Sequence, residues 1–280
     1  MNLPFQIDLS GETAVVTGGT GVIGGLYAEA LAKCGAKVAV LGRNKEHAEE
    51  VPNRIREAGG TAIAVSANVL DKASLEAARV ESLAAFGHIN ILVNCAGGAI
   101  KNAMIPEDQF SDLSEGMESF FTKDLGFVKQ ELDLNLYGTM LPTQVFGECL
   151  VGQENANIIN ISSMGAFGPL TRIPGYSSAK AGVSSFTEWA AIYFAKSGIR
   201  VNAVAPGFFM TPQNRHLHFN EDGTMTPRAE KIIRSTPMEK YGDPEDLVGG
   251  LLYLVSPKGS GFVTGVVLPI DGGFHIYQGV

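Results

Sequence analysis

The chain has 280 residues, of which 45% are hydrophobic and 18% are charged, with a formal net charge of −8. This composition is typical of a compact folded protein, since a chain of this length buries about three quarters of its unfolded surface. The negative charge argues against a nucleic-acid partner, which requires clustered Lys and Arg. Three cysteines outside any C-x-x-C pair, no secretory-type start and no apolar run of roughly 18 residues predict a cytoplasmic protein without a membrane span.

Short runs rich in β-branched residues alternate with longer segments of helical pattern. The expected strands are Thr13–Thr17, Lys37–Leu41, Thr61–Ala67, Ile89–Asn94, Asn157–Ser162, Arg200–Ala205 and Val263–Ile270. One helix should run through about Cys34 and another over Lys45–Ala58, where Gly59-Gly60 ends it. This alternation predicts an α/β protein with a single doubly wound Rossmann fold over residues 1–280, in which helices cover both faces of a mostly parallel sheet.

Two long segments, at about residues 98–128 and 212–241, interrupt the regular spacing. Long insertions in compact domains are usually either functional or disordered. Both segments follow the carboxyl end of an expected strand, where open α/β sheets bind ligands. We therefore expect them to form walls of a substrate site, with the second segment acting as a lid.

A glycine-rich turn, Thr17–Gly24, joins the first expected strand to the first expected helix. Glycine allows a tight turn and a close approach of the backbone to a pyrophosphate, whose charge the helix N-terminus stabilises. Such turns also occur for backbone reasons alone. The position between a strand and a helix nevertheless favours nucleotide binding.

A second constellation combines Tyr176, Lys180 and the upstream Ser163. Tyrosine has an ordinary pKa near ~10 and is a poor acid at neutral pH. Because Lys180 follows four residues later on a helix, its ammonium should lower the pKa of Tyr176 and suit this residue to proton transfer. Ser163 could hydrogen-bond the substrate oxygen. A half-buried tyrosine beside an exposed lysine is the structural alternative, but the nucleotide turn and the serine favour catalysis.

Over essentially its whole length the sequence resembles the short-chain dehydrogenase/reductase family. The shared motifs are TGGTGVIG at Thr17–Gly24, NCAG at Asn94–Gly97, LNLYG at Leu134–Gly138, ISS at Ile161–Ser163, YSSAK at Tyr176–Lys180, RVNAVAPG at Arg200–Gly207 and GVVLPIDGG near the end. The resemblance implies an oxidoreductase with the catalytic tetrad Asn135, Ser163, Tyr176 and Lys180. It also implies that Asn135 holds a water linking Lys180 to solvent, and that Lys180 binds the nicotinamide ribose.

The same resemblance, together with Arg43 considered below, assigns the cofactor contacts. The expected cofactor-binding residues are Gly18, Thr20, Gly21, Val22, Ile23, Gly24, Arg43, Asn68, Val69, Asn94, Ala96, Gly97, Tyr176, Lys180, Pro206, Gly207 and Thr211. Three positions depart from the usual family pattern: Val22 replaces a glycine, Asn68 an aspartate and Cys95 an asparagine. No departure removes a proton-transfer group, and no metal is expected.

The choice between NAD and NADP depends on the end of the second strand. This strand ends Leu41-Gly42-Arg43-Asn44, without the carboxylate that would bind the ribose diol of NAD. Arg43 could pair with the extra phosphate of NADP or stack on adenine; it could also be a solvated residue at a helix start. The pattern therefore favours NADP, although the subfamily considered next more often uses NAD.

Within the family, the sequence is most similar to the D-mannonate oxidoreductases (fructuronate reductases) of the short-chain type. The residues that carry this similarity are Leu141–Gly147 (LPTQVFG), Ala205–Thr211 (APGFFMT), Gln213-Asn214-Arg215 and the final DGGFHIYQGV. The similarity implies hydride transfer between a hexuronate keto group and its hydroxy acid. The alternatives are another ketone, such as a 3-oxoacyl thioester or a polyol product, and a non-catalytic nucleotide-sensing protein.

A hexuronate would need a cation beside its carboxylate, since an unpaired buried charge is costly. The candidates, in order, are Arg215, Lys101 and Arg172, all near expected strand or helix ends. The family resemblance also implies a homotetramer, packed through the helices around Leu136–Leu150 and Ala179–Ala195. Alternatively, the apolar faces of these helices only cover the sheet.

Overall fold

The structure, a computed structural model, describes residues 7–44, 48–111, 118–211 and 214–279. Its strands form one sheet in the order β3-β2-β1-β4-β5-β6-β7, and each neighbouring pair is parallel. The strands are β1 (Thr13–Thr17), β2 (Lys37–Gly42), β3 (Thr61–Ser66), β4 (Ile91–Asn94), β5 (Asn157–Ile161), β6 (Arg200–Pro206) and β7 (Val267–Ile270). The predicted doubly wound α/β fold with a parallel sheet is confirmed.

Two strands begin later than the sequence predicts, because side chains take over ladder positions. At β4, the side-chain oxygen of Asn90 accepts the Thr13 amide at 2.7 Å, so regular pairing starts at Ile91. At β7, Thr264 Oγ1 accepts the Val201 amide at 3.1 Å, and Gly265 follows with a φ of +81°. Only glycine adopts this backbone conformation at little cost. Regular pairing with β6 therefore starts at Val267.

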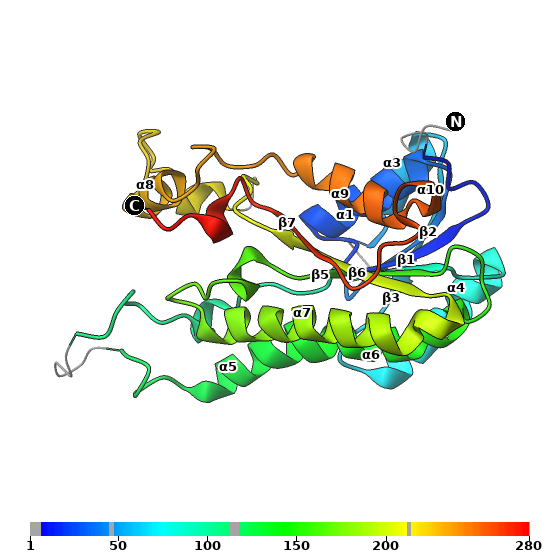
Figure 1. Cartoon of the computed structure of the whole chain (residues 1–280), viewed down its shortest axis with the longest axis horizontal. Coiled ribbons are helices and arrows are strands. Elements are labelled where there is room, and N and C mark those ends of the chain that lie inside the picture. The colour runs from blue at the N-terminus through cyan, green and yellow to red at the C-terminus, as the bar shows by residue number, and fades with distance from the viewer. Residues whose placement is uncertain (1–6, 45–47, 112–117, 212–213, 280) are drawn as a thin grey trace.

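Helices cover both faces of the sheet (Figure 1). They are α1 (Val22–Lys33), α3 (Glu50–Glu57), α4 (Lys72–Phe86), α5 (Leu125–Leu132), α6 (Gly138–Leu150), α7 (Pro174–Phe194), α8 (Pro227–Arg234), α9 (Asp246–Val255) and α10 (Pro257–Ser260). α1, α3 and α9 lie on one face, and α4, α6 and α7 on the other. Of the helix expected at Lys45–Ala58, the first three residues lie outside the described residues, and α3 forms its second half.

Each face of the sheet has its own hydrophobic core. Leu31 of α1 and Leu251 of α9 are fully buried in one core. Leu75 of α4 and Phe146 of α6 are fully buried in the other. Burial of one such side chain contributes roughly 1.5–3 kcal/mol, so both helical layers are firmly attached to the sheet. The carboxyl ends of the strands are therefore held at one edge.

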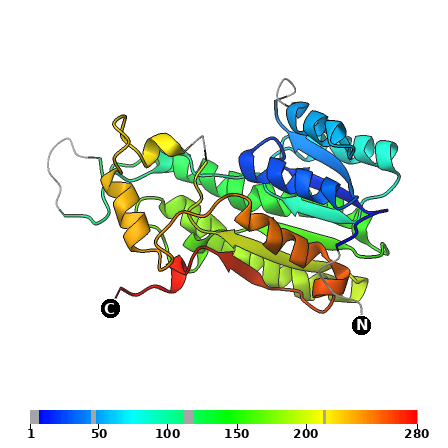
Figure 2. The ribbon, with the colours of Figure 1, turned by 90° about the horizontal axis from the view of Figure 1, so that it is seen from above.

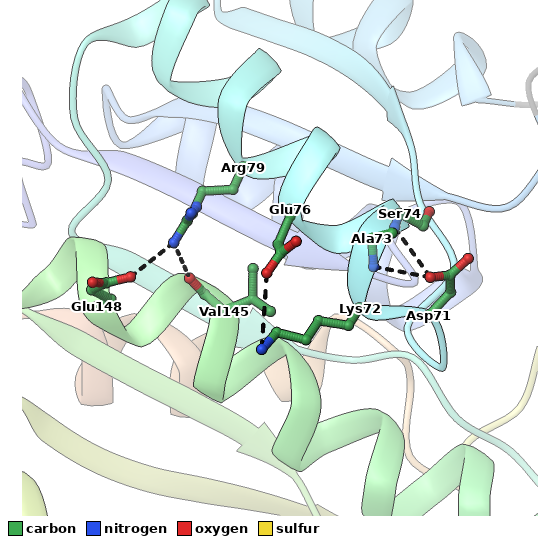
Figure 3. A network of polar contacts seen from close by, with 8 residues as sticks. All are labelled: Asp71, Lys72, Ala73, Ser74, Glu76, Arg79, Val145 and Glu148. Carbon is green, nitrogen blue, oxygen red and sulfur yellow. Dashed lines mark hydrogen bonds and ion pairs between the residues drawn. The ribbon is translucent and has the colours of Figure 1, made fainter.

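Polar contacts join α4 to α6 outside the core (Figure 3). Asp71 caps α4 by accepting the amides of Ala73 and Ser74. Arg79 donates to the Val145 carbonyl at 3.3 Å and pairs with Glu148 at 2.9 Å. An exposed pair of this kind contributes about 0–1 kcal/mol, so the contact aligns the two helices more than it stabilises them.

The two long segments lie at the same end of the molecule (Figures 1 and 2). The first follows β4 and contains a short 3₁₀ helix, Lys101–Ala103, before α5 begins. The second follows β6 and contains the 3₁₀ helix Arg215–Leu217 and α8. An ion pair between Asp108 and Lys231 of α8 connects them. Both segments thus flank the carboxyl edge of the sheet.

Candidate active site

The glycine turn after β1 packs tightly against its surroundings. Gly18 has a φ of +62°, and a Cβ there would lie 2.7 Å from the Cα of Ala96. A Cβ at Gly24 would lie 2.2 Å from the Gly18 carbonyl oxygen. α1 begins beside this turn at the N-cap Gly21, with no capping side chain and no acidic residue in its first turn. Its amides and its positive dipole end are therefore well placed to bind a phosphate.

A cleft of about 480 Å³ extends from this turn to α7. Thirteen of the expected cofactor residues line it: Gly18, Thr20, Gly21, Val22, Ile23, Gly24, Arg43, Val69, Ala96, Gly97, Tyr176, Lys180 and Thr211. Among the described residues that line it, Arg43 and Lys180 are the cations, and no carboxylate is present. An elongated cleft with phosphate-binding backbone and basic side chains fits a dinucleotide.

The other expected cofactor residues lie beside the cleft. Asn94 is buried and donates to Thr143 Oγ1 and Asn160 Oδ1, both at 2.9 Å, so it connects β4 to β5 and α6 beneath the cleft. The side chain of Asn68 accepts the Leu70 amide at 3.1 Å. Pro206 ends β6, and Gly207 follows it. None of these four residues is among those that line the cleft.

The structure brings the expected tetrad together at the α7 end of the cleft. Lys180 Nζ lies 5.6 Å from the ring centroid of Tyr176, one turn earlier on α7. Ser163, which follows β5, is near enough to Tyr176 to lower the pKa of its phenol. A Cβ added to Gly97 would lie 2.6 Å from Asn135 Oδ1 and 3.4 Å from Lys180 Nζ. Asn135 and Lys180 therefore meet beside the backbone after β4.

Asn135 lies in a π-helical turn, Asp133–Tyr137, between α5 and α6. Its Oδ1 accepts the Gly98 amide, and its Nδ2 donates to the carbonyls of Gly98 and Glu131, each at 2.9 Å. π-turns often occur at functional sites. The sequence gives the position of Asn135 but not the turn. The water expected beside Asn135 stays a prediction.

The pKa of Tyr176 differs from the sequence expectation. Burial raises the pKa of Tyr176, the Ser163 hydrogen bond lowers it, and the charge of Glu131 raises it further. Burial lowers the pKa of Lys180 to about 8, and its Nζ donates to the Ile161 carbonyl at 2.7 Å. The expectation that Lys180 lowers the pKa of Tyr176 is therefore wrong for this structure, because burial dominates. Tyr176 is a protonated acid at neutral pH.

Two further cavities are lined by residues of the long segments and of the stretch before α7. One, of about 360 Å³, lies between the start of α7, Phe208 and α8, and its charged lining residues are Asp108, Arg172, Arg228 and Lys231. The other, of about 420 Å³, has Lys101, Lys123 and Arg172 among its lining residues. Arg172 is common to both. Arg215 lines neither cavity; it is exposed, with its guanidinium 4.8 Å from the ring centroid of Phe219.

Two kinds of feature are absent from the described part of the molecule. No group of three His, Cys, Asp or Glu side chains is placed to hold a metal ion in residues 7–44, 48–111, 118–211 and 214–279. Within the same residues, no helix has the length and apolar character to cross a membrane.

A family model for short chain dehydrogenases matches residues 12–222. The protein belongs to this family. It is 47% identical over 278 residues to "Uncharacterized oxidoreductase UxuB" of Bacillus subtilis (strain 168), covering 99% of this chain and 100% of that protein. It is 32% identical over 270 residues to the 3-oxoacyl-[acyl-carrier-protein] reductase of Synechocystis sp., covering 96% and 99%. The protein is an oxidoreductase of the short-chain dehydrogenase family.

Solved structures of the family superpose over almost the whole chain. One is a Haemophilus influenzae protein described as "a putative D-Mannonate oxidoreductase" with bound NAD, which is 44% identical with full coverage of both chains and a TM-score of 0.95. Another is a gluconate 5-dehydrogenase from Burkholderia cenocepacia in complex with NADP and tartrate. It is 29% identical, with a TM-score of 0.81 and coverage of 96% and 97%. The D-mannonate similarity expected from the motifs is confirmed by the first structure.

Proposed function

We propose that the protein is an NAD(P)-dependent oxidoreductase that transfers a hydride between the nicotinamide and the keto or hydroxyl group of a sugar acid, of the D-fructuronate/D-mannonate type. The observation that carries this proposal is the position of Arg172, Arg228 and Lys231 around a cavity at the start of α7, the helix of Tyr176. Among the described residues, only one acidic side chain, that of Asp108, lines this cavity. A net positive cavity beside a proton donor suits an anionic carbonyl compound.

The protein's own residues would divide the work as follows. The first-turn amides of α1 would bind the pyrophosphate, Arg43 would contact the adenosine end, and Lys180 would bind the nicotinamide ribose. A bound nicotinamide would supply or accept the hydride. In reduction, Tyr176 donates its proton to the substrate oxygen, which Ser163 orients by a hydrogen bond. Asn135 fixes the Gly98 backbone beside Lys180.

Arg172 is the proposed partner of the substrate carboxylate. Its Nε donates to the Ile105 carbonyl at 3.0 Å, and the Ile105 amide donates to the Arg172 carbonyl at 2.8 Å. These bonds fix the residue between the two cavities. Its terminal nitrogens have no acceptor among the described residues. A guanidinium held in this way can bind a carboxylate through two parallel hydrogen bonds.

Replacing Arg172 with Met tests the proposal, with Arg215→Met as a matched control on the exposed surface. We expect R172M to raise the KM for a hexuronate at least about tenfold, through loss of a charge-assisted hydrogen bond, and to leave a neutral ketone almost unchanged. R215M should leave both substrates unchanged. An equal loss for both substrates in R172M, or a selective loss in R215M, would contradict the assignment of Arg172.

A 3-oxoacyl thioester is the second candidate substrate. The Synechocystis relative is a 3-oxoacyl-[acyl-carrier-protein] reductase, and Met104, Leu170, Ile173 and Phe208 give the substrate-side cavity an apolar wall. The cations of the same cavity favour the sugar acid. Assaying both substrate classes with the purified protein decides between them.

For the cofactor, the relatives support NAD(P) as a class. The Haemophilus structure contains NAD and the Burkholderia structure NADP, so they do not support the preference for NADP that was inferred from Arg43. Binding titrations of this protein with both cofactors measure the preference directly.

We also propose that the protein forms a homotetramer in the cytoplasm. Trp189, Ile192 and Tyr193 of α7 are 54%, 80% and 66% exposed, within one of the two helices expected at the interface. Exposed apolar patches of this kind often mark interfaces between subunits. The three cysteines are free thiols, which fits a reducing compartment. Light scattering of the purified protein tests the assembly.

A further inference from the structure

Glu131, in the last turn of α5, is fully buried although it carries a carboxyl group. One of its oxygens, Oε1, accepts the backbone amide of Ile100 at 2.8 Å. The other, Oε2, has no hydrogen-bond partner among the described residues. A buried carboxyl oxygen without a partner costs free energy, so a glutamate at this position requires an explanation beyond packing.

The unpartnered oxygen lies against the beginning of α7. A Cβ added to Gly175 would lie 2.6 Å from Glu131 Oε2, so this oxygen lies against the first turn of α7. α7 has Ile173 as its N-cap and no capping side chain of its own. The carboxyl of Glu131 therefore lies at the positive end of the α7 dipole, where anionic groups are stabilised.

The same turn of α5 holds the backbone that follows β4. The carbonyl of Glu131 accepts Asn135 Nδ2 at 2.9 Å, and Asn135 bonds both the amide and the carbonyl of Gly98. The side chain of Glu131 holds Ile100, two residues further on. Glu131 thus connects three parts of the site: the turn that carries Asn135, the Gly98–Ile100 backbone, and the helix that carries Tyr176 and Lys180.

We propose that Glu131 is a positioning residue, which caps the first turn of α7 from α5, holds the Gly98–Ile100 backbone against that helix and places a negative charge beside Tyr176. The proposal rests on the role of Tyr176 as proton donor in the proposed function. It goes further because it assigns a task to a residue outside the tetrad.

The charged and titratable groups around Tyr176 determine whether its pKa is raised or lowered. Ser163, after β5, lowers the pKa of Tyr176 through its hydrogen bond, whereas the charge of Glu131 raises it. Cys95, after β4, has a thiol whose pKa is raised to about 12 by burial, so it is neutral at physiological pH. Lys180, on α7 itself, donates to Ile161. Glu131 is therefore the anion that opposes formation of the Tyr176 phenolate.

The surroundings of Glu131 itself include no opposing charge among the described residues. Burial raises the pKa of its carboxyl, and the amides of Ile100 and Tyr176 lower it. Its neighbours on α5 and in the π-turn, Lys129 and Asp133, pair with each other at the surface. When Glu131 is ionised, removal of its charge should lower the pKa of Tyr176, since a like charge disfavours the phenolate.

The test compares Glu131→Gln with the wild type and with Asp133→Asn. E131Q keeps the size of the side chain and an acceptor for the Ile100 amide but removes the charge. D133N removes the same charge from an exposed position two residues away.

In the reduction assay, activity falls as the pH rises through the pKa of the proton donor. We expect this fall to move to lower pH in E131Q and to stay in place in D133N. At pH values below the fall, kcat of E131Q should stay within about twofold of the wild type.

Glu131→Leu tests the capping role. Loss of both carboxyl oxygens should lower kcat roughly tenfold to hundredfold at every pH through misplacement of Tyr176, whereas E131Q should restore it. Cofactor affinity and melting temperature show whether E131L is folded. If E131L fails to fold, the pH profile of E131Q still tests the proposed role of Glu131. A profile for E131Q that coincides with those of the wild type and D133N would overturn the proposal.

Tyr176→Phe separates failure of this proposal from failure of the proposed function. If Y176F keeps more than about a tenth of the wild-type rate, Tyr176 is not the proton donor, whatever E131Q shows. The ionisation of Tyr176 is also measurable without turnover, by subtracting the phenolate absorbance titration of Y176F from that of the wild type. The same subtraction with E131Q and its Y176F double variant should give a lower pKa; an unchanged pKa contradicts the electrostatic role of Glu131.

Discussion

The cofactor side and the substrate side of this site are built in different ways. On the proposed cofactor side, the arrangement is set by the backbone: missing Cβ atoms at Gly18 and Gly24 bring a turn, a helix N-terminus and the segment after β4 together. On the proposed substrate side, Arg172 from the stretch before α7 and Arg228 and Lys231 from the second long segment line a cavity. Backbone recognition depends on a few glycines, whereas side-chain recognition depends on which charged residues line the cavity.

This difference explains how one fold can serve different substrates. The Haemophilus and Burkholderia structures superpose with TM-scores of 0.95 and 0.81 and contain NAD and NADP. Their descriptions, together with that of the Synechocystis reductase, nevertheless refer to different substrate types. Function is therefore set by the site carried on the scaffold, and the substrate side must be argued from its own side chains.

The largest effect is expected where the two sides meet, at Tyr176. Tyr176→Phe removes the transferable proton and little else, so kcat should fall roughly a hundredfold to ten-thousandfold while cofactor affinity stays nearly unchanged. Steady-state kinetics and a fluorescence titration of the cofactor measure the two quantities. A parallel loss of kcat and of cofactor affinity would mean that Tyr176 contributes to cofactor binding rather than to proton donation.

A change on the cofactor side should be next in size. Gly24→Ala places a Cβ 2.2 Å from the Gly18 carbonyl oxygen, so the turn must shift, and we expect cofactor affinity to fall roughly tenfold to hundredfold. Gly147→Ala in α6 is the matched control, because among the described residues no atom beyond its chain neighbours and the nearby backbone of its own helix would lie within 4 Å of the added Cβ. Equal affinities for the two variants in a binding titration would show that the turn does not set the phosphate site.

Arg43 contributes a charged side chain to the cleft on the proposed cofactor side. If it binds the phosphate of NADP, Arg43→Ala should weaken NADP about tenfold to hundredfold and leave NAD within about twofold. Titration of both cofactors against wild type and variant measures the two losses. Equal losses would show that Arg43 stacks on adenine or packs on the cleft wall.

The smallest expected effect is on stability and concerns Lys180. Burial lowers its pKa from 10.5 to about 8, so in the folded state it loses its proton at lower pH than in the unfolded state. Between about pH 8 and pH 10 the unfolded state therefore binds more protons, and this group makes stability rise with pH. Lys180→Met should remove that contribution. Identical changes of melting temperature with pH in wild type and K180M would contradict a buried Lys180 with a lowered pKa.

The sequence was sufficient for the features that depend on local pattern. Strand runs, the glycine turn and the spacing of Ser163, Tyr176 and Lys180 all depend on neighbours along the chain, so motif and periodicity predict them. The late start of β4 was missed because the Asn90 side chain replaces a ladder bond only once β1 lies beside it. The same applies to every feature that depends on contacts between distant segments.

Electrostatic features were the hardest to predict. The raised pKa of Tyr176 depends on burial and on Glu131, which lies 45 positions earlier in the sequence. One sequence signal could have indicated the role of Glu131: it lies four residues before Asn135, on a helix that is otherwise expected to bury apolar residues. Arg215 is similar: its proximity to Thr211 in sequence suggested a place beside the substrate, whereas the 3₁₀ helix directs it toward Phe219 at the surface.

The most direct test of the proposed function is a comparison of kcat/KM for D-fructuronate and a 3-oxoacyl thioester, with the purified wild-type protein and each reduced cofactor. Because Arg172, Arg228 and Lys231 surround the substrate-side cavity, we predict that the hexuronate is reduced to its hydroxy acid with the higher kcat/KM and that one nicotinamide is oxidised for each product formed. Turnover of the thioester with no turnover of any hexuronate would contradict the account.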